Sequence, residues 1–216
     1  MPDYSDRESA VLFGKVTANV SHEIKNSLAI IKEIAGLQSD LLAAAERGRP
    51  LDPARLGSLA DRIGKQVEKA DIVVKRMNRF AHTVDCLKKT VDMGEEIGFI
   101  IELVDRLFQM RGILIHAQFP SEPVLAETDP FRLVAAVIAS MQVFLDCLTK
   151  GDELNIQVLS SNKGAMVGFK THEDNLVLPP DCQGDIRCAL QGLGATVLIP
   201  GKDHSLELIF PGRMAI

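Results

Sequence analysis

One short segment of the sequence places a histidine, a carboxylate and an amide within five residues. His22 is followed directly by Glu23 and, four residues on, by Asn26. On a helix, residues four apart lie on the same face, so Asn26 would stand beside His22. A neutral imidazole is a nucleophile near pH 7, and a neighbouring carboxylate can orient it, fix its tautomer and accept a proton. The combination suits phosphate held on an imidazole, although an exposed histidine on a polar helix face is most often simply part of the surface.

The histidine falls in a long stretch with the apolar spacing of an amphipathic helix. At about 100° per residue, His22 lies about 200° from both Val20 and Ile24, so we expect its side chain to be exposed to solvent. The apolar positions predicted to face a partner are Phe13, Val16, Val20, Ile24, Leu28, Ile31, Ile34 or Ala35, and Leu41.

A second helix is predicted by apolar residues that alternate steps of four and three, the pattern of a coiled-coil seam. Between the two helices, Gly48 provides a stop, Asp52 a cap and Pro53 a first helical residue. The chain thus begins with a helical hairpin whose apolar surface would be buried by a second hairpin, giving a homodimeric four-helix bundle. The seam positions are Leu56, Ala60, Ile63, Val67, Ala70, Val74, Met77, Ala81 and Val84.

After residue 88 the pattern changes to short helices and strands. We expect two domains, a hairpin over 1–88 and an α/β sandwich with an antiparallel or mixed sheet over 89–216, which makes the fold class α+β. The predicted helices cover 93–110, 129–149 and 182–193, and the predicted strands cover 113–119, 154–159, 165–171, 195–199 and 205–210.

The segment from His22 to Asn26 resembles the H box of two-component sensor histidine kinases, with Ser27 where that family usually has proline. The resemblance implies a phosphate-bearing His22 with Glu23 and Asn26 as its catalytic neighbours. It also implies that Lys25 and Ser27 contact phosphate or the regulator. The expected partners are a second copy of the chain, a response regulator receiver domain and an upstream kinase.

Residues 89–216 are similar to the ATP-binding domain of the same family in three segments, 129–133, 191–197 and 205–211. The nucleotide chemistry differs. The helix that should present asparagine to magnesium has Val143, Phe144 and Asp146 there, and His172 and Asp174 stand where a glycine-rich loop should approach the nucleotide. An acidic loop repels triphosphate, so we expect no cofactor of the chain's own, although a weak residual nucleotide site stays open.

The resemblance is closest to dimeric bacterial histidine phosphotransferases, which keep the hairpin and a degenerate kinase-like domain. In that case the regulator supplies both the aspartyl phosphate and the Mg²⁺. The same residues suit hydrolysis of the regulator's phosphate. Two alternatives are an autokinase with a divergent nucleotide site and a signalling scaffold without chemistry.

Composition adds mainly exclusions. The formal charge of -5 and the lack of a long basic run give no reason to expect nucleic acid. No apolar segment reaches the roughly 20 residues of a membrane span, and the first residues lack the features of a signal peptide, so we expect a cytoplasmic protein. The cysteines form no Cys-x-x-Cys pair, which predicts buried free thiols and no metal site. They are Cys86, Cys147, Cys182 and Cys188.

Overall fold

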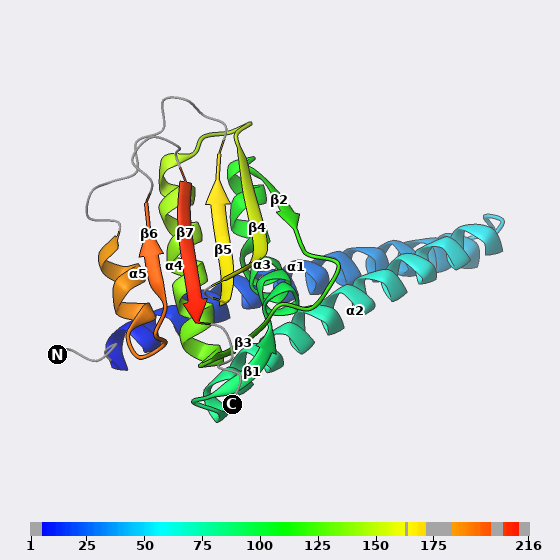
Figure 1. Ribbon diagram of the computed structural model, residues 1–216. Coiled ribbons are helices and arrows are strands. Elements are labelled where there is room, and N and C mark those ends of the chain that lie inside the picture. Colours follow the sequence, from blue (N-terminus) through cyan, green and yellow to red (C-terminus); the bar gives the residue numbers. More distant parts are fainter. Residues whose placement is uncertain (1–5, 163, 172–182, 200–204, 212–216) are drawn as a thin grey trace. The chain divides into compact units, whose positions relative to one another are not determined.

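The computed structural model describes residues 6–162, 164–171, 183–199 and 205–211 (Figure 1). The chain divides into two compact units. One consists of Thr17–Arg79, and the other of Met1–Val16 together with Phe80–Ile216. The predicted class, α+β with a helical hairpin followed by a small sandwich, is confirmed.

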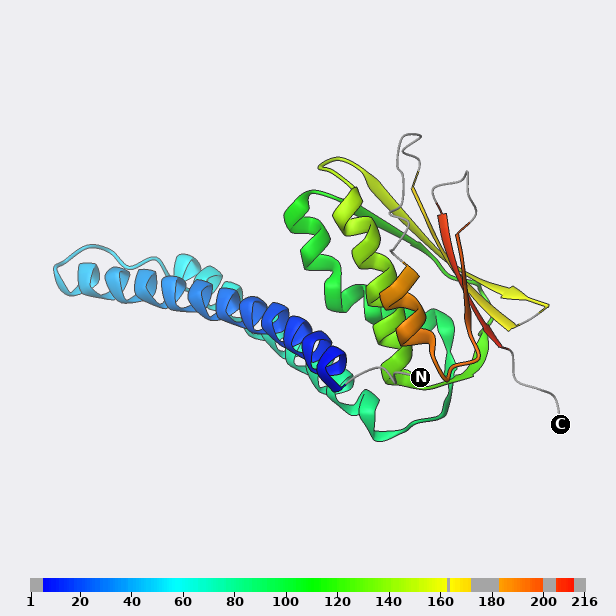
Figure 2. The same ribbon diagram turned by 90° about the vertical axis from the view of Figure 1, so that its left-hand side faces the viewer.

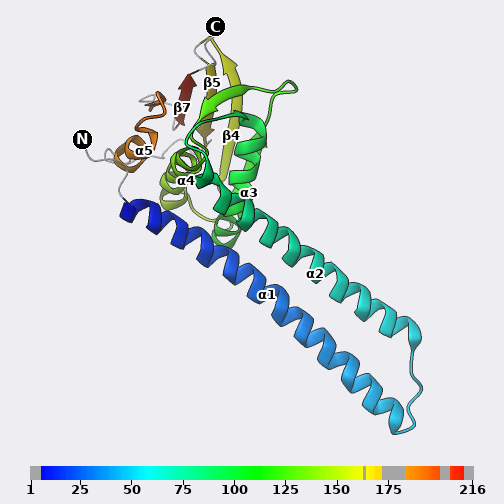
Figure 3. The same cartoon turned by 90° about the horizontal axis from the view of Figure 1, so that it is seen from below.

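The hairpin is built from α1, Asp6–Glu46, and α2, Pro53–Ala81, which run alongside each other and are joined at one end (Figure 3). Gly48 has φ 86°, the left-handed conformation that ends helices, and the N–H of Arg49 donates to the Ala44 carbonyl at 3.1 Å. Oδ1 of Asp52 accepts from the N–H of Ala54 at 2.9 Å, which caps α2. The predicted stop and cap are confirmed.

Within residues 17–79, the buried residues other than Asn19 fall in two rows with heptad spacing, one on each helix. Val20, Ile34, Leu59 and Val73 are each less than 9% exposed. None of the nine predicted seam positions of the second helix lies in the buried row of Leu59 and Val73, and all nine are partly buried or exposed. The predicted stripe lies beside that row, because the helix turns a different line of residues towards its neighbour.

A second apolar surface of the hairpin is exposed. Leu28 precedes Ile34 by six residues and Val67 precedes Val73 by six. The same rotation of about 120° from the buried row, in two antiparallel helices, turns both side chains to the same side of the hairpin. Leu28 is 55% exposed and Val67 53%. We call this surface the open face, and its members are Leu28, Ala35, Leu42, Ala60, Val67 and Val74.

The other unit contains a two-stranded and a five-stranded sheet. In the first, β1, Lys89–Asp92, pairs antiparallel with β3, Leu125–Thr128. The second has the order β2-β4-β5-β7-β6, in which β2 and β4 are parallel and the other pairs antiparallel. Its strands are β2 Leu114–Gln118, β4 Glu153–Ser161, β5 Gly164–Lys170, β6 Thr196–Leu198 and β7 Ser205–Pro211.

Three helices cover one face of the larger sheet (Figure 2). They are α3 Met93–Arg111, α4 Pro130–Cys147 and α5 Gln183–Leu190. A short 3-10 helix, His82–Asp85, follows α2. The core lies between the helices and the sheet, because alternate residues of β4, β5 and β7 are buried.

Local signals in this unit act as predicted. Gly112 ends α3 with φ 71°, and Oδ1 of Asp129 caps α4 by accepting from the N–H of Arg132 at 3.0 Å. Among the described residues, α4 is the one helix long and apolar enough to cross a membrane, but 56% of it is buried inside the protein. Its apolar composition is that of a core helix. The strands β1 and β3 were not predicted.

Replacing Phe144 with alanine tests the core. The ring is fully buried and stacks on Phe169 with centroids 6.3 Å apart. We expect Phe144→Ala to lower the free energy of unfolding by about 3–5 kcal/mol, measured by chemical denaturation. Met110→Ala is the control, because Met110 is 73% exposed and its loss should change stability by less than about 0.5 kcal/mol. Equal effects would contradict this description of the core.

Candidate functional site

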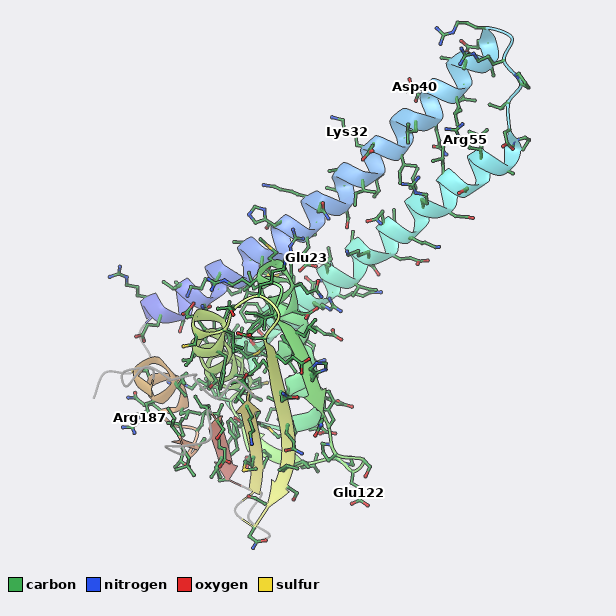
Figure 4. All side chains as sticks on the ribbon, turned by 90° about the horizontal axis from the view of Figure 1, so that it is seen from above. Glu23, Lys32, Asp40, Arg55, Glu122 and Arg187 are labelled. Carbon is green, nitrogen blue, oxygen red and sulfur yellow. The ribbon has the colours of Figure 1, made fainter. Side chains whose placement is uncertain are left out.

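His22 lies on α1, and its side chain is exposed as predicted. Asn26 and Lys25 are also exposed, whereas Glu23 is partly buried. Figure 4 marks Glu23 on α1, with Lys32 and Asp40 further along the helix towards the loop. The helix therefore presents an imidazole, an amide and an ammonium group to solvent within two turns.

The direction of His22 follows from helical geometry. At about 100° per residue, His22 points about 140° away from Ser27 in the buried row and about 120° away from Leu28 on the open face. Asn26 lies only about 40° from His22. A partner that covered the open face would thus leave the histidine and the amide accessible.

Ser27 is buried, whereas a contact with phosphate or a regulator requires an exposed side chain. Its side chain is 1% exposed. The reason is its register, since Ser27 lies seven residues after Val20 and seven before Ile34, both of which are buried. The expectation that Ser27 meets a partner is corrected by this burial, and the heptad row of Val20, Ser27 and Ile34 was the signal in the sequence.

Sequence reasoning also passed over Asn19. This residue is 8% exposed and takes part in a polar interaction within the chain. It precedes Glu23 by four residues, so the two side chains are neighbours on the helix surface. Burial of an amide is visible only in the structure, because the sequence places Asn19 between the apolar positions of α1.

The positions that the resemblance aligns with the family's nucleotide site differ in burial. Val143 is partly buried, and Phe144 fills the interior of the sandwich. Asp146 is exposed and accepts a hydrogen bond from Nε2 of Gln142 at 2.7 Å. His172 and Asp174 lie outside the described residues. Of the described positions, therefore, only Asp146 offers an oxygen that could reach a metal ion.

The segment 129–133, which resembles part of the family's ATP-binding domain, connects the start of α4 to the end of α5 through Arg132. A guanidinium N–H of Arg132 donates to the carbonyl oxygen of Gln191, just beyond α5, and Nε of Arg132 lies 3.9 Å from Oδ2 of Asp129. Arg132 thus ties the start of α4 to the end of α5. Its described contacts are structural.

Metal and thiol chemistry find little support in the described part of the chain. No group of three or more His, Cys, Asp or Glu side chains there could hold a metal ion. Cys147 and Cys188 are partly buried, but Cys86 is exposed, contrary to the expectation of buried thiols. Burial, and to a smaller extent the carboxylate of Asp146, raises the pKa of the Cys147 thiol. That thiol is therefore a poor nucleophile at neutral pH.

The sequence matches no protein-family model and no curated protein. The structure is similar to several solved structures. One is the Acinetobacter baumannii histidine kinase AdeS, with a TM-score of 0.49 and 12% identity over 89% of this chain and 98% of that one. A bacterial phosphotransferase has a TM-score of 0.45 and 12% identity over 92% of this chain and 96% of that one.

Histidine kinase ThkA in complex with the response regulator protein TrrA is a third similar structure. Its TM-score is 0.48, with 17% identity over 95% of this chain and 63% of that one. Two of these three proteins are histidine kinases and one is a phosphotransferase. Identities this low say nothing about the chemistry of individual residues.

The burial of Ser27 can be tested by introducing a charge. Ser27→Asp would put an unpaired carboxylate in the buried row, so we expect the free energy of unfolding to fall by more than about 2 kcal/mol. Ser39 is on the same helix but exposed, and Ser39→Asp should change stability by less than about 0.5 kcal/mol. Thermal unfolding at equal protein concentration is the measurement. If Ser27→Asp left the free energy of unfolding unchanged, the burial of Ser27 would be contradicted.

Proposed function

We propose that this chain is a dimeric two-component signalling module that carries phosphate on His22 and exchanges it with the aspartate of a response regulator. The observation that carries the proposal is the exposed His22, which faces away from both the buried row and the open face. Glu23 lies beside it and Asn26 one turn later. The hairpin of residues 1–88 would carry the chemistry, and residues 89–216 would be a degenerate kinase-like domain.

The transfer step needs only groups that this site and a phosphorylated receiver supply. A ring nitrogen of neutral His22 attacks the phosphorus, the N–P bond forms as the P–O bond to the aspartate breaks, and the aspartate leaves as a carboxylate. The proton on the other ring nitrogen passes to Glu23, directly or through one water. Lys25 offsets phosphate charge. The reverse sequence returns phosphate to a regulator.

The regulator, not ATP, is the proposed source of phosphate. Transfer from ATP requires magnesium ligands and donors around a triphosphate. Phe144 fills the core at a position compared with that site, and the sequence Glu173-Asp174 adds negative charge where the family has glycines. The Mg²⁺ would come with the receiver domain.

Hydrolysis of the regulator's phosphate is a second reaction that the same residues suit. Asn26 is exposed on the flank of His22, and its amide could hold a water molecule near a bound aspartyl phosphate. Glu23 would orient that water.

The open face supports the homodimer. The large apolar side chains of the open face, which come from both helices, are 41% to 55% exposed in a single hairpin. Isologous pairing of two hairpins would bury them. Because His22 points away from this surface, dimerisation would leave it accessible to a regulator.

Loss of the imidazole is the direct test of function. We expect His22→Ala to accept no phosphate from a labelled, phosphorylated receiver domain, because alanine has no ring nitrogen, and to remain a dimer. His82→Ala is the matched control, since His82 is exposed and pairs with Asp85 at 2.7 Å. Label on the His22→Ala protein would refute the site.

The dimer is tested by a charge on the open face. Val67→Glu should raise the dimer dissociation constant at least about a hundredfold, measured by analytical ultracentrifugation, because pairing would bury the carboxylate. Ile72→Glu is the control. Ile72 is 48% exposed but lies about 140° from Val67 around the helix, so its variant should dimerise normally. An unaffected Val67→Glu dimer would place the interface elsewhere.

A further inference from the structure

The side of the hairpin opposite the open face carries residues of both helices. Each helix reaches the open face six positions before a buried residue. Asn26 instead follows the buried Val20 by six positions, and Lys65 follows the buried Leu59 by six. Their rotation of about 120° is in the opposite sense, so both side chains are turned away from the open face. His22 is turned in that same sense, by about 140° from the buried row.

Two more residues of α2 are turned to this side. Lys69 precedes the buried Val73 by four residues and Ile72 precedes it by one. These positions are rotations of about 40° and 100° in the same sense as that of Lys65. Ile72 is 48% exposed, and both lysines are also exposed. We call Lys65, Lys69 and Ile72 the α2 patch.

The lysines of the α2 patch are free of acidic partners within the described part of the chain. Lys75, on the same helix, pairs with Asp71 at 2.7 Å, whereas no described residue forms an ion pair with Lys65 or Lys69. The acidic side chains of α2 are turned about 140–160° from the buried row, to the outer side of the helix. They are Asp61, Glu68 and Asp71. Two unpaired cations thus stand on this side of a chain whose formal charge is -5.

The α2 patch lies within reach of a partner bound at His22. At the loop, α1 ends at residue 46 and α2 begins at residue 53, so residues of the two helices whose numbers add to about 99 stand at about the same height. Ile72, Lys69 and Lys65 are then level with residues 27, 30 and 34. At 1.5 Å per residue they stand about 8, 12 and 18 Å from His22 along the hairpin.

A receiver domain is large enough to cover His22 and the α2 patch together. A specific interface buries about 800 Å² on each partner, which corresponds to a disc about 32 Å across. The open face would be occupied by the second copy in the proposed dimer, so the receiver approaches from another side. It brings an aspartyl phosphate, which is an anion, and unpaired lysine side chains are complementary to that charge.

We propose that the α2 patch is a docking surface for the receiver domain of the response regulator. Ile72 supplies an apolar contact, and Lys65 and Lys69 attract the acidic face of the receiver that carries the aspartyl phosphate. This inference rests on the proposed function, because that function identifies the partner. Neither lysine is needed at the reacting atoms, so the attraction acts on the rate of encounter and not on the chemical step.

Glu33 makes the charge argument testable in the opposite direction. It precedes the buried Ile34 by one residue and is exposed, so it is turned to the same side as the α2 patch. Its carboxylate opposes the approach of an anionic partner. Glu33→Gln should therefore raise the second-order rate constant of transfer at low salt by about twofold.

The test measures single-turnover transfer from a phosphorylated receiver at several receiver and NaCl concentrations. The double variant Lys65→Glu/Lys69→Glu should lower the second-order rate constant at least about tenfold at low salt and weaken its salt dependence. Its rate at saturating receiver should change less than about twofold. Ile72→Glu should raise KM about tenfold. Arg47→Glu/Arg49→Glu is the matched control, because it changes the charge equally at exposed positions in the loop, more than about 36 Å from His22 along α1.

A normal second-order rate constant for Lys65→Glu/Lys69→Glu at low salt would overturn the inference, as would an equal loss in the loop control. An unchanged KM of Ile72→Glu would overturn it too. Binding of the receiver to the His22→Ala protein is a second readout that does not depend on transfer, and there the double variant should raise Kd about tenfold. Label on His22→Ala would instead remove the proposed function.

Discussion

The rotation of α1 about its own axis controls the rest of the site. A heptad row containing Val20, Ser27 and Ile34 is buried, and this row determines the direction of every other side chain on the helix. His22 and Asn26 are turned to solvent, and Leu28 is turned to the open face. A shift of the row by one residue would rotate His22 by about 100° towards a buried surface. The packing of one helix face thus decides whether the imidazole is available for chemistry.

The two apolar surfaces of the hairpin have different roles. The buried row holds each helix in register, and the open face supplies the area for a second copy in the proposed dimer. His22 and Asn26 belong to neither surface. Substitutions on the open face can therefore test dimerisation without changing the proposed chemistry, and substitutions of His22 can test the chemistry without changing the dimer. In the second unit, Phe144 and its neighbours on α4 contribute to the core.

Local signals in the sequence predicted much of this fold. Gly48, Asp52 and Gly112 end or begin helices where the structure places those boundaries, because capping depends on a few neighbouring residues. The exposure of His22 followed from helical periodicity alone. The strands β1 and β3 were missed because four residues each carry too little alternation to be seen, and their pairing joins segments far apart in the sequence. The burial of Ser27 was also missed, although Val20 and Ile34, seven residues to either side, carried the signal. Asn19 lies outside that row, so its burial had no such signal in the sequence.

The measurement that tests the central claim most directly is the source of the phosphate on His22. The purified protein would be incubated with labelled ATP and Mg²⁺ alone, and in parallel with a receiver domain that already carries labelled aspartyl phosphate. The account predicts label on His22 only in the presence of the phosphorylated receiver. Label from ATP alone would contradict it and make the chain an autokinase.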